Sequence, residues 1–107
     1  MPFLKNAKLL FSVSKQSSYS YTLTSNSSLI MVITGYIVDG DTTNNYRYPS
    51  IVSSTSSVIS KNAIVGRITG DTIEYCVTCT ILSSMKAGDT LSASGYSPRV
   101  SVMIFGL

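Results

Sequence analysis

Apolar and polar residues alternate with a period of two over most of the chain. The apolar members of the clearest runs are Leu9/Phe11/Val13, Tyr19/Tyr21/Leu23, Ile73/Tyr75/Val77/Cys79/Ile81 and Val100/Val102/Ile104. Such a period is typical of β-strands that have one face on a core and the other toward solvent. We therefore expect each of these apolar sides to contact the core. No stretch carries an apolar stripe of helical period over a helical length.

Two segments are apolar on both faces. Leu29–Ile33 contains no polar position, which predicts a strand in the middle of a sheet that is covered on both sides. In the last strand, Met103, Phe105 and Leu107 lie opposite the core-facing residues, and an apolar outer face must be covered or it causes aggregation. In a small sandwich without helices, the natural cover is another copy of the chain. We predict that the oligomer interface contains Met31, Met103, Phe105 and Leu107.

Glycine beside aspartate separates several of these runs, which is turn chemistry. The strands expected between the turns are 8–14, 18–24, 28–38, 50–53, 57–60, 63–69, 72–83 and 90–106, the last of which we expect to divide into two. Several short strands with regular turns indicate a sandwich or a barrel. The predicted fold class is all-β, an antiparallel, jelly-roll-like β-sandwich of about eight short strands.

Length and composition narrow the class of protein. The 107 residues fit one domain, 1–107, which could also be the C-terminal part of a longer protein. Only 12% of residues are charged, about half the usual share, which favours a surface partly covered by sister subunits over a monomer rich in surface hydroxyls. The eight Lys and Arg are scattered singly, so we expect no nucleic-acid partner. The apolar stretch 29–38 is too short for a membrane helix, and 1–5 lacks the features of a signal peptide.

The residue types argue against catalysis. The chain has no histidine, which removes the commonest general base and excludes Ser–His nucleophilic triads. Four of the five carboxylates flank turn glycines, where aspartate is common for local backbone reasons. Asp39 and Asp41 with Asn44 and Asn45 could donate oxygens to Ca²⁺, but they lack the ordered ligand spacing of a calcium loop. We predict no enzyme activity, no catalytic residue, no metal and no cofactor.

Cys76 and Cys79 form a Cys-x-x-Cys motif inside a predicted strand. Residues three apart on a strand point to opposite faces and lie about 10 Å apart, which is too far for a disulfide. A zinc site would need two more ligands, and the sequence has neither a histidine nor a third cysteine. We expect buried free thiols.

The longest polar loop, Asp39–Pro49, is the best candidate for ligand binding. Tyrosine rings can stack on sugars, while Asn, Asp and Arg can pair with hydroxyl groups. The candidate ligand-binding residues are Asp39, Asp41, Asn44, Asn45, Tyr46, Arg47 and Tyr48, joined by Tyr36 and Tyr96 if the loops cluster. The alternative is that Tyr46 and Tyr48 only hold a long loop in place.

Residues 83–107, SSMKAGDTLSASGYSPRVSVMIFGL, resemble the C-terminal signature of trimeric jelly-roll tips on phage tail fibres. Its parts are Met85–Thr90, the short strand Leu91–Ser94 and the apolar strand Val100–Leu107. The layout is also similar to the complement and tumour-necrosis-factor-like superfamily, and the segment SLIMVITGYIV is similar to the central strand of such heads. The resemblance places Gly88 and Asp89 in a turn, and implies that Met103, Phe105 and Leu107 face a three-fold axis.

The resemblance implies a receptor-binding head in the virion, at a tail fibre or tail tip, that acts outside the host cell. It implies a homotrimer whose distal loops touch a host-surface glycan or protein, with other virion tail proteins as further partners. Binding residues vary within such families, so none carries over to this chain. The main alternative is a structural virion component, such as a collar, head-fibre or capsid decoration protein, with no host ligand. A weaker alternative is a cellular cytokine-like or lectin domain.

Overall fold

The computed structural model describes residues 6–39, 48–67, 73–93 and 100–107, and its elements in these ranges are eight strands. In chain order they are β1 (Lys8–Gln16), β2 (Tyr19–Thr22), β3 (Ser27–Asp39), β4 (Ser50–Val52), β5 (Val58–Arg67), β6 (Ile73–Met85), β7 (Thr90–Ala93) and β8 (Val100–Gly106). This confirms the predicted all-β class and the division of 90–106 into two strands. The strands expected at 57–60 and 63–69 are instead one strand, β5, with an irregularity between Val58 and Ser60.

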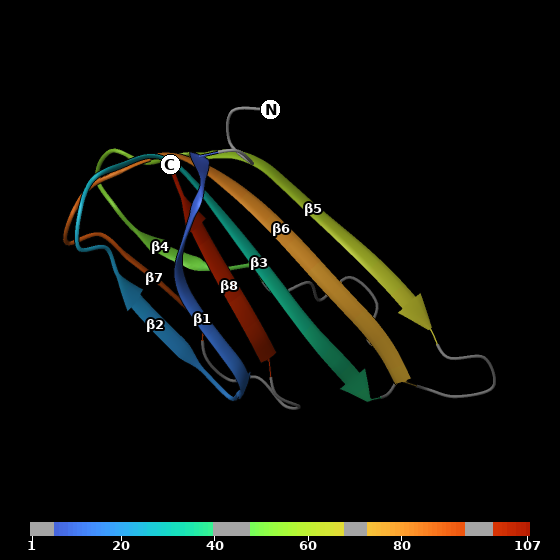
Figure 1. Cartoon of the computed structure of the whole chain (residues 1–107). Helices are drawn as coiled ribbons and strands as arrows, with labels where there is room; N and C mark the ends of the chain where they lie inside the picture. The colour runs from blue at the N-terminus through green and yellow to red at the C-terminus, as the bar shows by residue number, and fades with distance from the viewer. Residues whose placement is uncertain (1–5, 40–47, 68–72, 94–99) are drawn as a thin grey trace.

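The strands form two antiparallel sheets that face each other (Figure 1). The five-stranded sheet has the order β1-β8-β3-β6-β5 and the three-stranded sheet has the order β2-β7-β4. The first strand pairs with the last, the second with the seventh and the third with the sixth. This nested pairing is the winding of a jelly roll, in which two Greek keys close a double sheet. Here β5 remains beside β6 in the larger sheet.

The core lies between the sheets and is built from the inward positions of both. Its buried apolar residues are Tyr19, Leu23, Ile30, Val32, Tyr36, Cys76, Leu82, Met85, Leu91, Val100, Val102 and Ile104. The predicted inward sides of β2 and β8 are therefore confirmed. The central place of β3 is also confirmed, since it pairs with β8 on one side and β6 on the other.

The predicted inward side of β6 is wrong. Thr78 and Thr80 are fully buried, whereas Val77 is 43% exposed. The register explains this reversal, because Thr78 lies opposite Thr34 and Thr80 lies opposite Val32, both of which point into the core. The alternation in β6 identified correctly which residues share a face, but the more apolar of its two faces is the outer one.

The predicted inward side of the N-terminal strand, β1, is also wrong in part. Leu9, Phe11 and Val13 do not share a face, because the register of β1 against β8 shifts between Leu9 and Phe11. Leu9 lies opposite Phe105 on the outer side and is 55% exposed, while Phe11 packs against the core. A single extra residue in a strand reverses the side of everything beyond it.

Candidate functional site

The predicted ligand-binding loop joins strands at one end of the sandwich. The chain leaves β3 at Asp39, which lies opposite Ile73 at the start of β6, and β8 begins at Val100, opposite Tyr36. The strand ends that flank residues 40–47, 68–72 and 94–99 therefore lie at the same end (Figure 1). Asp41, Asn44, Asn45, Tyr46, Arg47 and Tyr96 lie outside the described residues. Of Asp39 only the backbone position is described.

The structure describes the side chains of two predicted ligand-binding residues, Tyr36 and Tyr48. The prediction for Tyr36 is wrong, because this residue is 6% exposed and belongs to the core. The ammonium of Lys61 in β5 lies 4.9 Å from the centre of the Tyr48 ring, and Pro49 beside it is buried. A cation over an aromatic face at this distance is attracted by the ring quadrupole. The contact connects the end of the loop to the larger sheet. The sequence contains no signal for it, because only the strand positions bring Lys61 to the ring.

All four predicted interface residues lie on the outward side of the five-stranded sheet. Met31 lies opposite Phe105, and Ile33 opposite Met103, on adjacent strands. We call this side the outer apolar face; its described members are Leu9, Ser12, Leu29, Met31, Ile33, Gly35, Ser60, Asn62, Ile64, Gly66, Val77, Cys79, Ile81, Ser83, Ser101, Met103 and Phe105, together with Leu107 directly after β8. None of these side chains is charged.

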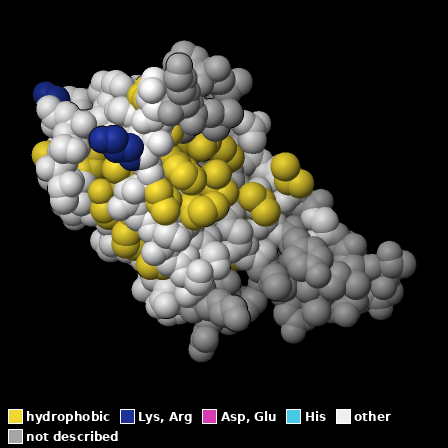
Figure 2. Space-filling model, in the orientation of Figure 1, with side chains coloured by type: hydrophobic (Ala, Val, Ile, Leu, Met, Phe, Trp, Pro, Cys, Tyr) yellow, Lys and Arg dark blue, Asp and Glu magenta, His cyan; other side chains and the backbone are white. Residues whose placement is uncertain are grey.

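Figure 2 shows apolar side chains gathered into a patch near the middle of the molecule, with no acidic side chain of a described residue in view. The register extends this surface beyond the predicted residues to Leu9, Val77 and Ile64, of which Ile64 is 74% exposed. Of these three residues, Val77 has a signal in the sequence, because it belongs to the alternation in β6. That alternation predicted its side to face the core, whereas the side faces outward.

A second surface, the hydroxyl face, lies on the outward side of the three-stranded sheet. Cross-strand register places its described members side by side: Ser20, Thr22, Ser50, Val52, Thr90 and Ser92. Their neighbours Tyr21, Leu91 and Ile51 point inward to the core. All outward residues except Val52 carry a hydroxyl group, so this face can remain in contact with water.

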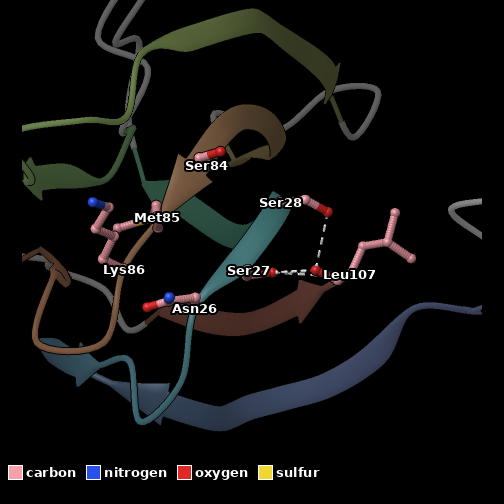
Figure 3. A pocket seen from close by; sticks show the side chains of 7 residues that line it. All are labelled: Asn26, Ser27, Ser28, Ser84, Met85, Lys86 and Leu107. Carbon is pink, nitrogen blue, oxygen red and sulfur yellow. Dashed lines mark hydrogen bonds between the residues drawn. The ribbon is translucent and has the colours of Figure 1, made fainter.

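A pocket of about 390 Å³ lies at the opposite end of the sandwich from the predicted loop (Figure 3). The hydroxyls of Ser27 and Ser28 donate to the carbonyl oxygen of Leu107 at 2.8 and 3.3 Å. The Leu107 amide in turn donates to the Ser27 hydroxyl at 3.0 Å. These hydroxyls hold the end of β8 against the start of β3. The pocket's one charged lining residue among those described is Lys86, which is too little to define a chemical site.

The segment Lys86–Asp89 beside this pocket forms a tight turn. Gly88 has a φ of 96°, a conformation that favours glycine, and the Asp89 amide donates to the Lys86 carbonyl at 3.0 Å. The Asp89 carboxylate accepts the Lys86 amide at 2.9 Å and the Ser53 hydroxyl at 2.6 Å. These two bonds hold the pKa of Asp89 below its ordinary value. Gly88 and Asp89 are thus in a turn, as the resemblance implied.

The two cysteines are free and point to opposite sides of β6, as predicted. The prediction of buried thiols holds for Cys76, which lies in the core, and is wrong for Cys79, which is only half-buried because it lies on the outer apolar face. Burial raises the pKa of the Cys79 thiol, so it is protonated at neutral pH. Within the part of the chain that the structure describes, no group of three or more His, Cys, Asp or Glu is placed to hold a metal ion.

The described residues define an antiparallel β-sandwich of five and three strands with two contrasting outer faces. Its described residues contain no helix long and apolar enough to cross a membrane. No protein-family model matches the sequence, and comparisons with curated proteins and with solved structures return no match.

Proposed function

We propose that this chain is a non-enzymatic receptor-binding head of a phage tail fibre or tail tip, which recognises a host-surface glycan or protein as a homotrimer. The observation that carries the proposal is the uncharged outer apolar face, which includes Met31, Met103 and Phe105 on two neighbouring strands and Leu107 directly after the second of them. An apolar patch of this kind on a small domain marks a contact surface. A head built from several copies leaves the ends of its sandwiches free to meet a receptor.

The end that carries the predicted binding residues supports the same proposal. Four connections leave the sandwich there, between β1 and β2, β3 and β4, β5 and β6, and β7 and β8. One of them is the loop that starts at Asp39 and returns at Tyr48. Loops on a rigid β scaffold are a common place for recognition residues. The sandwich would thus separate the two tasks, with assembly on the side of the larger sheet and recognition at one end.

The proposal is tested by the binding of purified protein to a glycan array and to whole bacterial cells. Tyr46→Ala and Arg47→Ala should lose most of the binding while their melting temperature stays that of the wild type. Thr22→Ala on the hydroxyl face is the matched control and should bind normally. Tyr48→Phe keeps the ring beneath Lys61 and removes only the hydroxyl, so a loss of binding in this variant would assign that hydroxyl to the ligand.

A structural virion component without a host ligand is the second candidate. The contact of Lys61 with the Tyr48 ring favours it, because a tyrosine occupied by a neighbouring side chain is held for packing. Absence of binding to every glycan and cell type, with stable assembly of the purified chain, would support this candidate and overturn the first.

A further inference from the structure

Gly35 stands in the middle of β3, the central strand of the five-stranded sheet, where glycine weakens a strand. It has neither of the usual reasons to be there. Its φ is not positive, so the backbone does not require glycine, and a Cβ added at this position would meet no atom within 4 Å. Gly106 on the inner side is the contrast, since a Cβ there would come within 2.6 Å of Leu10. Crowding within the chain therefore explains Gly106 but not Gly35.

The missing side chain of Gly35 leaves a hollow in the outer apolar face. Its volume is about 280 Å³, and Ile33, Val77 and Met103 line it together with small residues of β1 and β8. The register explains the shape, because Gly35 lies between Ser101 on one side and Val77 on the other. Small-molecule sites are commonly about 300–1,000 Å³ and carry a few convergent polar groups. This hollow is at the lower limit of that range and has no charged lining residue, so it suits an apolar side chain.

We infer that the hollow over Gly35 receives an apolar side chain from a second copy of this chain. This inference rests on the homo-oligomer in the proposed function and adds the position at which the copies meet. Glycine in a strand often marks a place where another chain approaches closely. Each copy also supplies protruding side chains on the same face, such as Ile64 and Met103, which are 74% and 42% exposed. In a closed ring, each copy inserts such a side chain into the hollow of the next.

Area and charge both favour a second copy as the occupant. Five strands about 4.8 Å apart, over the seven residues of β8 at about 3.3 Å each, cover roughly 500 Å². Two copies that meet over the whole of such a face bury roughly 1,000 Å², which is the lower limit for a specific interface, and in a ring of three each copy divides its face between two neighbours. A partner of different sequence would have to present a surface equally free of charge. Among the surfaces that the structure describes, the hydroxyl face is also free of charge, but only the outer apolar face is both uncharged and mostly apolar.

The test is Gly35→Val, measured by sedimentation velocity over a range of protein concentrations. Valine fills the hollow and suits a strand, so the variant should fold, melt at or above the wild-type temperature and associate at least tenfold more weakly. Ser20→Val adds the same side chain to the hydroxyl face and should associate like the wild type. If Gly35→Val fails to fold, Gly35→Ala with its smaller side chain should still weaken association measurably.

Three results would overturn the inference. Association of folded Gly35→Val equal to that of the wild type would show that the copies meet elsewhere, and the proposed oligomer would stand. A wild-type chain that remains a monomer at its highest soluble concentration would end both the inference and the proposed homotrimer, while leaving the receptor test to be decided by cell binding. A monomer that carries an apolar small molecule in native mass spectrometry would make the hollow a ligand site.

Discussion

The two outer faces of the sandwich differ in composition although both belong to antiparallel sheets of one small chain. The face of the three-stranded sheet carries hydroxyl groups at all its described positions except Val52. The face of the five-stranded sheet carries mostly aliphatic, aromatic and sulfur-containing side chains, with a few uncharged polar residues such as Ser12, Asn62 and Ser101 and no described charge. A surface that stays in water has no need of the second composition. The comparison teaches that only the larger sheet has an outer face whose composition is typical of a contact surface, which is why self-assembly is the core of the proposed function.

The largest expected effect comes from a charge placed on the outer apolar face, and the same charge on the hydroxyl face is its control. Met103→Asp puts a carboxylate in the outer apolar face, where contact with another copy would bury it without a partner at a cost of several kcal/mol. We expect self-association to weaken by about a hundredfold or more, equivalent to about 2.7 kcal/mol. Ser92→Asp adds the same charge to the hydroxyl face and should leave association unchanged.

Sedimentation equilibrium measures both variants, and alkylation of the cysteines supplies an independent readout. Cys79 lies on the outer apolar face and Cys76 in the core of the same strand. Assembly should slow the alkylation of Cys79 in the wild type and in Ser92→Asp but not in Met103→Asp, with Cys76 protected in all three. Equal association of the two aspartate variants would remove the distinction between the faces.

Two substitutions on the inner side of β6 should have an intermediate effect, on the free energy of unfolding. They compare two buried threonines within a single strand. Thr78 and Thr34 are hydrogen-bonded to each other in the core, whereas the buried hydroxyl of Thr80 has no hydrogen-bond partner among the described residues. Thr78→Val should cost about 1–2 kcal/mol in the free energy of unfolding, because it removes a bond from a buried hydroxyl. Thr80→Val should instead stabilise the chain by about 1 kcal/mol.

Urea denaturation of the two valine variants, made in the Met103→Asp background so that association does not contribute, measures these changes. The substitutions are nearly equal in volume and two residues apart on one face, so each is the control for the other. Changes of the same sign in both would contradict the hydrogen-bond assignment and leave only a general preference for apolar groups at these positions.

The sequence predicts the class of fold because a period of two and glycine turns are local properties. It also identifies which residues share a side of β2, β6 and β8. It does not tell which side of β6 is inward, since that depends on the register with β3, whose own residues are apolar on both faces. Leu9 faces outward because of a register shift between β1 and β8, and alternation along the sequence cannot predict such a shift.

The candidate surfaces show the same distinction between local properties, which the sequence predicts, and properties that depend on how the strands pair. The residues Met103 and Phe105 are predictable because they alternate with buried neighbours within β8, and Leu107 continues this alternation directly after the strand. Ile64 and Gly35 are not, because their importance arises from strands that are distant in sequence and adjacent in the sheet. The contact of Lys61 with Tyr48 is of the same kind.

The smallest expected effect is at Asp89, in the turn between β6 and β7 and on neither outer face. The Lys86 amide and the Ser53 hydroxyl lower the pKa of this carboxyl in the folded chain below its ordinary value of 3.8. The resulting stabilisation is present above pH 3.8 and is lost as the pH falls through the lower folded-state pKa. The melting temperature of the wild type should therefore exceed that of Asp89→Asn at neutral pH, by a margin that shrinks in acid. Ser53→Ala, which keeps the Lys86 bond, should lose less. Because the turn lies on neither face, all three proteins should associate equally; an altered association constant in Asp89→Asn would mean that the contact between copies extends past the sheet to this end of the sandwich.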